Sequence, residues 1–142
     1  MPDHNDTLEL SVHSQAVTQA LEWLERIAER QDWAPRAAFG LTLCLDEALT
    51  NVMSYAFQPP PTAVQPAIAL ACRTSEGRVV LELRDNGHPY NPSAEVSPPL
   101  ANCLDDAAPG GHGLRLMRHY LEDLRYQRQG GWNCLTMVMS LL

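Results

Sequence analysis

The first half of the chain carries three distinct patterns of hydrophobic and polar positions. Residues 7–12 alternate apolar and polar side chains, which predicts a half-buried strand. Residues 15–30 repeat apolar side chains at helical spacing, which predicts an amphipathic helix with Ser14 as its N-cap. After a break at 32–35, a second apolar stripe predicts a longer helix over 41–56 that ends before a run of prolines.

The second half begins and ends with strand patterns. Residues 67–73 and 78–84 are separated by a short polar segment of hairpin length, which predicts an antiparallel pair. Residues 114–121 place apolar side chains on one helical face. Residues 124–129 and 133–141 then predict a closing hairpin that turns at two glycines.

Residues 85–113 differ from the rest, because they are rich in proline and glycine and have little periodicity. They predict a long loop, and long loops inside compact domains tend to be functional. The predicted order is therefore β, α, α, β, β, loop, α, β, β. This order predicts an α/β fold, a two-layer α/β sandwich with a mixed, mostly antiparallel sheet, helices on one face and the other face open. We expect a single domain over 1–142.

Composition narrows the function classes. Hydrophobic residues make up 45% of the chain and charged residues 19%, which is typical of a folded globular protein. The net charge of −7 and the lack of a basic run disfavour direct binding of nucleic acid. The sequence has no leader-like N-terminus and no apolar stretch long enough to span a membrane, so we expect a cytoplasmic protein with no membrane partner.

Four cysteines lie about thirty residues apart in the sequence. Their spacing contains no CxxC motif, and no histidine pair lies near any of them in the sequence. Neither a zinc site nor a redox pair is indicated, and free, mostly buried thiols are the better interpretation. They are Cys44, Cys72, Cys103 and Cys134.

Glu47 and Asn51 are the first candidate chemical pair. They lie four residues apart, so they project from the same side of the second helix, at the edge of its apolar stripe. An asparagine carbonyl is a suitable oxygen ligand for Mg²⁺, and the glutamate could act as a base. An isolated pair of this kind is usually a solvated helix face, so alone it decides nothing.

Two glycine-containing segments complete the set of candidates. Asp85 ends a predicted strand and Gly87 follows in a turn, where a fixed carboxylate could accept a hydrogen bond from a purine amino group. Residues 109–114 lead a glycine cluster into a helix N-terminus, which is suited to phosphate binding. The alternatives are an ordinary turn and a flexible hinge, respectively.

Taken in order, Glu47 with Asn51, Asp85 with Gly87, and residues 110–114 resemble the N, G1 and G2 boxes of the GHKL ATPases, a superfamily that includes DNA gyrase and histidine kinases. Within it, the segments EALTN, DNGHPYNP and GGHGLRLM are most similar to anti-sigma-factor serine kinases of the partner-switching type. The likeness spans almost the whole chain. It implies the Bergerat ATP-binding fold, with ATP and Mg²⁺ as cofactors.

The resemblance also implies roles for individual residues. Glu47 would be the catalytic base toward a substrate serine, Asn51 would coordinate Mg²⁺, and Asp85 would recognise the adenine amino group. Gly87 would shape the adenine pocket, and Tyr90 would begin an ATP lid over about 90–109. The remaining nucleotide-binding residues would be Gly110, Gly111, His112, Gly113, Leu114 and Arg115.

The partners implied are a STAS-domain anti-anti-sigma factor, phosphorylated on serine, and a sigma factor that the chain sequesters; a homodimer is also in keeping with the family. Two departures from the superfamily are visible. Ser54 stands where histidine kinases commonly have a basic residue, and Thr136 is offset from the usual threonine of a late strand, so it is assigned no role. The alternative function is a non-catalytic, ATP-dependent partner-switching module.

Overall fold

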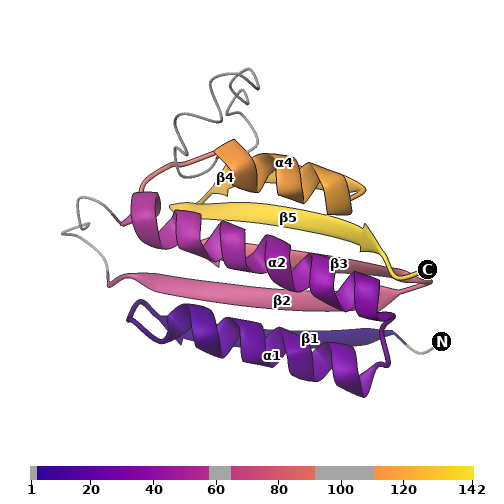
Figure 1. Cartoon of the computed structure of the whole chain (residues 1–142). Coiled ribbons are helices and arrows are strands. Elements are labelled where there is room, and N and C mark those ends of the chain that lie inside the picture. Colours follow the sequence, from indigo (N-terminus) through magenta and orange to yellow (C-terminus); the bar gives the residue numbers. More distant parts are fainter. Residues whose placement is uncertain (1–2, 58–64, 92–110) are drawn as a thin grey trace.

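The computed structural model describes residues 3–57, 65–91 and 111–142. Its strands and helices occur in the order predicted from the sequence. The first strand lies at one edge of the sheet, and the described helices lie against one face of it (Figure 1). The elements are β1 (His4–Ser11), α1 (Ala16–Arg30), α2 (Pro35–Asn51), the π-helical turn η1 (Val52–Ala56), β2 (Ala67–Ser75), β3 (Arg78–Asp85), α4 (Gly111–Tyr120), β4 (Asp123–Gln129) and β5 (Trp132–Ser140).

The five strands form one sheet in the order β1-β2-β3-β5-β4. Each neighbouring pair in the described part of the chain is antiparallel, so the predicted mixed pairing is corrected to antiparallel pairing throughout. The reason is the helix pair between β1 and β2. Helix α1 runs back along the sheet and α2 returns, so β2 starts beside the end of β1, with Ser11 opposite Ala67.

The described helices cover one face of the sheet, as predicted (Figure 1). Alternate strand side chains pack beneath them, including Leu70, Leu81 and Met137, which are almost fully buried. Helix α1 packs on α2, and α2 packs on α4. The opposite face carries the alternate, partly exposed set of strand side chains, and none of the described helices covers it.

Two of the four cysteines are part of this core. Cys44 of α2 and Cys72 of β2 are free and buried, which confirms the thiol interpretation for both. Burial, with the nearby charge of Glu47, raises the pKa of Cys44 to about 12. Burial, with the charge of Asp6, likewise raises the pKa of Cys72 to about 12. Cys134 is free and half-buried, and Cys103 lies outside the described residues.

Three helix boundaries differ from the sequence prediction. Helix α1 begins after Gln15, without a side-chain cap, so Ser14 is not the N-cap. Instead, His13 accepts hydrogen bonds from the first backbone N–H groups, at its ring Nδ1 and its carbonyl oxygen. Helix α2 begins at Pro35, because proline is preorganised for a first helical position. Helix α4 begins at Gly111, three residues before the predicted start.

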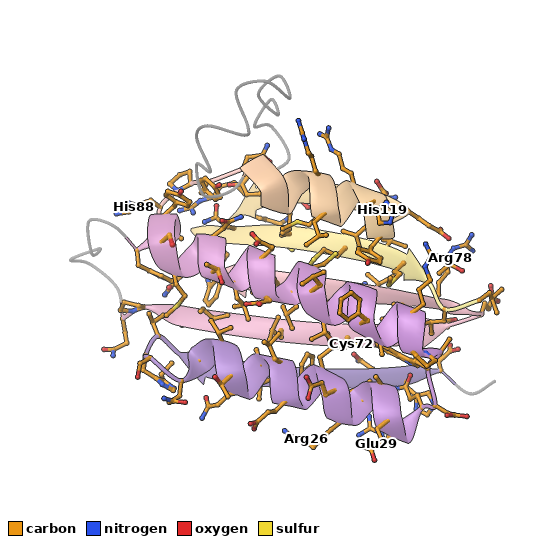
Figure 2. All side chains as sticks on the ribbon, in the orientation of Figure 1. Arg26, Glu29, Cys72, Arg78, His88 and His119 are labelled. Carbon is orange, nitrogen blue, oxygen red and sulfur yellow. The ribbon has the colours of Figure 1, made fainter. Side chains whose placement is uncertain are left out.

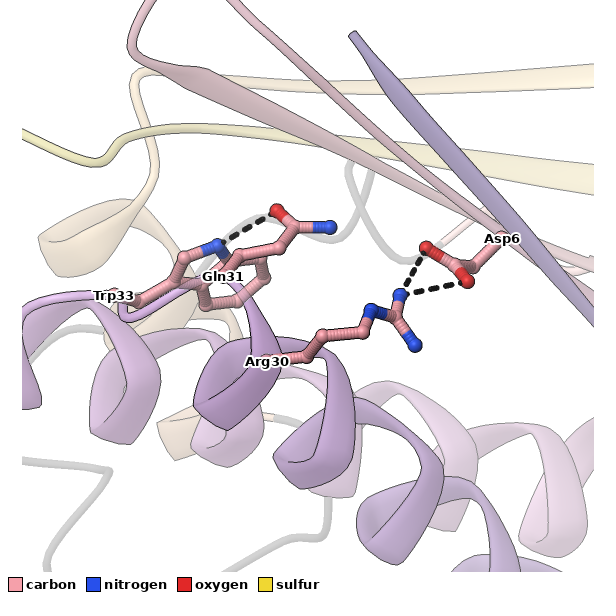
Figure 3. A network of polar contacts seen from close by, with 4 residues as sticks. All are labelled: Asp6, Arg30, Gln31 and Trp33. Carbon is pink, nitrogen blue, oxygen red and sulfur yellow. Dashed lines mark hydrogen bonds and ion pairs between the residues drawn. The ribbon is translucent and has the colours of Figure 1, made fainter. Parts of the chain in front are cut away.

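The C-terminal end of α1 is attached to β1 by polar contacts that we call the Arg30 network (Figure 3). Arg30, in the last turn of α1, donates from Nη2 to both carboxylate oxygens of Asp6 at 2.8 Å. Beside it, the indole Nε1 of Trp33 donates to the side-chain oxygen of Gln31 at 3.0 Å. Asp32 has a φ of 55°, and this left-handed residue reverses the chain between α1 and α2.

Candidate functional site

Helix α2 and strand β3 end at the same end of the sheet, opposite to the Arg30 network. Figure 2 labels His88 at this end and Arg78, the first residue of β3, at the other. The side chains of Asn51 and Asp85 meet here around a small cavity of about 20 Å³. Its lining consists of Ala48, Asn51, Val52, Leu83, Asp85, Tyr90, Tyr126, Asn133 and Leu135.

Asp85 is a buried carboxylate at the last position of β3, with 3% of its surface exposed. Its Oδ1 accepts a hydrogen bond from the backbone N–H of Gly87 at 3.0 Å and another from Nδ2 of Asn133 at 2.9 Å. Burial raises the pKa of Asp85, while these two hydrogen bonds and the charge of Arg128 act to lower it. Both of these bonds end on Oδ1, and Asp85 is one of the residues that line the cavity.

Asn133 is a site residue that the sequence analysis missed. Its Nδ2 also donates to the carbonyl oxygen of His88 at 2.7 Å, and its Oδ1 accepts from the hydroxyl of Tyr126 and the backbone N–H of Tyr90. The side chain therefore joins β3, the following turn and β4. The only signal that could have found it is strand register, because Asn133 pairs with Asp85 across β3 and β5.

Position 87 requires a glycine, because the backbone at the end of η1 lies very close to it. A Cβ atom at this position would lie 2.3 Å from the carbonyl oxygen of Ala56, at the end of η1. The same carbonyl accepts a hydrogen bond from the N–H of His88 at 2.6 Å. Arg128 of β4 donates to the carbonyl oxygen of Gly87 at 2.7 Å. The turn after β3 is thus held between the helix end on one side and β4 on the other.

Glu47 and Asn51 lie one helical turn apart on α2, but the structure places them differently. Asn51 is buried and lines the cavity, whereas Glu47 is half-buried and does not line it. The helix changes to the π form directly after Asn51, over Val52–Ala56. Single π turns occur often at functional sites, because the extra residue alters the direction of the side chains around it.

Tyr90 forms one wall of the cavity and stacks on Tyr55 of η1, with ring centroids 5.2 Å apart. The cavity holds about one water molecule, so an adenine ring enters only if side chains at its edge move. The predicted lid begins at Tyr90, and residues 92–109 of it lie outside the described residues.

The predicted phosphate-binding segment is described in part. Gly110 lies outside the described residues, and Gly111, His112, Gly113 and Leu114 form the first turn of α4, where the structure describes the backbone but not the side chains. This N-terminus lies at the same end of the sheet as the end of β3 (Figure 1). Backbone N–H groups of a first helical turn favour anions. Arg115, next in α4, is half-buried.

The donor set around the cavity fits a magnesium ion that is held mainly by phosphates and water. Such an ion needs only one or two protein oxygen ligands, and the buried carboxamide of Asn51 offers one. Within 3–57, 65–91 and 111–142, no group of three or more His, Cys, Asp or Glu side chains gathers to hold a metal by itself. In the same ranges, no helix is long and apolar enough to cross a membrane.

Comparisons with known proteins identify the family and the fold. Residues 10–139 match the histidine kinase-like ATPase domain family. The chain is 54% identical over 138 residues to the serine/threonine-protein kinase BtrW of Bordetella bronchiseptica, covering 97% of this chain and 95% of the relative.

Two solved structures share the fold at low sequence identity. One is the SiaB-SiaC complex of Pseudomonas aeruginosa, with a TM-score of 0.66 and 15% identity over 94% of this chain and 88% of that one. The other is the histidine kinase domain of the blue-light activated histidine kinase EL346 of Erythrobacter litoralis, with a TM-score of 0.56 and 14% identity over 89% of this chain and 59% of that one.

Proposed function

Because the chain belongs to the histidine kinase-like ATPase domain family, we propose that the cavity between α2 and β3 binds Mg-ATP for phosphorylation of a partner protein on serine. The 54% identity to a serine/threonine-protein kinase over nearly the full chain assigns the enzyme class. The observation that carries the proposal is the buried carboxylate of Asp85, held by two donors on Oδ1.

Adenine recognition follows from the hydrogen-bonding capacity of Asp85. An ionised carboxylate only accepts hydrogen bonds, so Asp85 would select a ligand edge that carries a donor, such as the 6-amino group of adenine. Asn133 and Gly87 fix the carboxylate in one orientation before the ligand arrives. Preorganisation of this kind removes an ordering cost from binding.

At the phosphate end, Asn51 would hold the magnesium ion, and the first turn of α4 would donate backbone N–H groups to phosphate oxygens. The ion supplies charge neutralisation for the transferring phosphoryl group. Arg115 is the cation nearest to this turn in sequence, and residues 90–109 contain no Lys or Arg. Charge stabilisation by the protein therefore depends on backbone dipoles, Asn51 and Arg115.

Glu47 would take the proton of the substrate serine hydroxyl. The serine oxygen then bonds to the γ-phosphorus, the bond from that phosphorus to the β–γ bridging oxygen breaks, and ADP leaves. Glu47 is half-buried on the turn of α2 that precedes Asn51, so it is accessible to a protein substrate outside the cavity.

The substrate would be a STAS-domain anti-anti-sigma factor, phosphorylated on a serine. When it is not bound to this substrate, the chain would sequester a sigma factor, and it would act either as a monomer or as a homodimer. Support for these finer assignments comes from the motifs EALTN, DNGHPYNP and GGHGLRLM. The second candidate function is a non-catalytic module that uses nucleotide only to select partners. The observation that favours this second function is the half-buried position of Glu47 outside the cavity.

The test combines nucleotide affinity with phosphoryl transfer. The wild-type chain, Glu47→Gln and the matched control Glu29→Gln, an exposed carboxylate of α1, are each incubated with labelled ATP and a STAS-domain protein from the same cell. Loss of the base is expected to slow transfer by about two to four orders of magnitude. Calorimetry should give ATP affinities within about threefold for all three proteins, because Glu47 does not line the cavity.

Equal labelling by wild type and Glu47→Gln would show that Glu47 is not the base. If the wild type binds ATP but labels no partner, the chain is the non-catalytic module. Recovery of a sigma factor on the purified chain, released when the STAS-domain protein is added, is the expected result for sequestration.

A further inference from the structure

Helix α2 carries apolar side chains on its solvent side as well as on its core side. Leu41, Cys44 and Leu45 face the core and are fully buried. Phe39, by contrast, has 60% of its surface exposed, which is unusual for the large apolar residues described here. A helix that is apolar on both sides is ordinarily covered on both. Helices α1 and α4 pack on its flanks, where the ring of Phe39 meets that of Tyr120 edge-on, and no other helix in the described part of the chain covers this outer side.

This exposed side forms a shallow groove, which we call the outer groove. It has a volume of about 280 Å³ and lies on the outside of the helical layer, the side that faces the viewer in Figure 2. It is distinct from the cavity at Asp85, with which it shares no residue. Its lining consists of Glu25, Ala38, Phe39, Thr42, Leu43 and Asp46.

The lining defines the chemistry of an occupant. The α2 residues of the outer groove follow helical spacing from Ala38 to Asp46, so the groove is about two turns, or roughly 12 Å, long. Phe39 and Leu43 form its apolar centre. Its two charged residues, Glu25 and Asp46, are both acidic and come from different helices. A short helix is the element that fills a groove beside two packed helices.

We propose that the outer groove docks an amphipathic helix of a partner protein that presents one large apolar side chain flanked by Arg or Lys. The apolar side chain would cover Phe39 and Leu43, and the two cations would pair with Glu25 and Asp46. Two outer grooves facing each other are a poor fit, because Glu25 and Asp46 of one copy would then meet the same acidic residues of the other. The outer groove contains neither Glu47 nor any residue of the Asp85 cavity, so docking there can be tested apart from ATP binding.

The test uses a fluorescein-labelled 14-residue helix of leucine and lysine as the probe, at physiological salt. Anisotropy is expected to show saturable one-to-one binding to the wild type and none for the matching helix of leucine and glutamate. Phe39→Ser should weaken binding at least tenfold without changing the net charge. The double variant Glu25→Lys/Asp46→Lys should also weaken binding at least tenfold. The control double variant Glu9→Lys/Glu76→Lys has the same charge change at two exposed positions outside the groove, and it should change binding less than threefold.

Amide chemical-shift changes in the wild type locate the probe without any substitution, and we expect them to centre on residues 38–46. Binding that survives Phe39→Ser, or that weakens equally in both charge-reversal pairs, would be non-specific attraction and would overturn the proposal. So would a wild-type dimer that Phe39→Ser makes monomeric, because the occupant would then be a second copy. Unchanged ATP affinity in these variants separates this test from that of the proposed kinase function.

Discussion

At the scale of single residues, the burial of Asp85, the residue that we propose recognises adenine, has a cost in stability. Its pKa is raised, chiefly by burial, so the folded protein binds a proton more readily than the unfolded chain does. Stability therefore falls as the pH rises through the interval between the unfolded and the folded pKa, and the full cost is present above it. A buried carboxylate kept for binding is a common reason for such a cost.

We predict that Asp85→Asn weakens ATP binding by about tenfold to a hundredfold, because an amide N–H would face the adenine amino group. The same variant should have a higher Tm than the wild type at pH 7.5, since the desolvation of the carboxylate is removed. The difference should shrink as the pH is lowered, because the wild-type carboxyl then becomes protonated. Calorimetric titration and thermal melts across pH measure both effects; a wild type that is more stable than the variant at pH 7.5 would contradict the explanation.

At the scale of elements, the turn after β3 depends on contact with the end of η1. A Cβ on Gly87 would meet the carbonyl of Ala56, and a backbone carbonyl cannot rotate away as a side chain can. We predict that Gly87→Ala lowers stability by about 1–3 kcal/mol and weakens ATP binding at least tenfold, because the turn moves away from η1 and Asp85 loses one donor. Chemical denaturation and ATP titration measure the two effects.

The control for Gly87→Ala is Gly130→Ala, at the β4–β5 turn. No atom lies within 4 Å of a Cβ placed there, so only its left-handed backbone, with a φ of 59°, is unfavourable to alanine. The cost should be about 1–2 kcal/mol with no change in ATP affinity. If both variants lose affinity equally, the contact between Gly87 and Ala56 is not what holds the site.

The elements themselves could be predicted from the sequence because periodicity is a local property. The alternation in 67–73 and 78–84 and the stripe in 41–56 each identify an element and its buried face. What local patterns could not give was pairing between distant segments. The antiparallel sheet depends on the return path of α1 and α2, and Asn133 becomes a site residue only through its register opposite Asp85.

The candidate site was predictable to a similar degree. Asn51, Asp85 and Tyr90 were named from motifs, and they meet at one cavity. The role of Gly87 as a contact for a helix carbonyl required the packing of η1, which no motif describes. Glu47 and Asn51 were predicted as a pair, but they lie one helical turn apart in different surroundings. Asn51 is buried in the cavity lining, whereas Glu47 is half-buried outside it. Its catalytic role remains a prediction for the kinase test.

At the scale of the whole molecule, the buried thiols report on global unfolding. Cys44 and Cys72 are buried, so reagents do not reach their thiols in the folded state, and their pKa values near 12 keep the thiols un-ionised at pH 8. We predict that iodoacetamide modifies both only when the core opens, and that Cys134, half-buried on the other face, reacts faster. Mass spectrometry of each cysteine over time measures the rates.

Ligand binding should change these rates in a defined way. Mg-ATP at about 100 times its Kd stabilises the folded state by about 2.7 kcal/mol, so alkylation of Cys44 and Cys72 should slow by about a hundredfold. A nucleotide without effect on either thiol would mean that it does not bind the folded core. Clearly different rates for Cys44 and Cys72 would mean that the core opens locally rather than as one unit.

The end of the sheet farthest from Asp85 has a practical consequence. His4 and Leu142 line one cavity there together with Trp33, so both ends of the described chain emerge side by side (Figure 1). A domain fused to either end would project away from the cavity at Asp85. The chain could also be closed into a ring by a short flexible linker, or anchored to a sensor surface by either end, with the cavity at Asp85 facing solution.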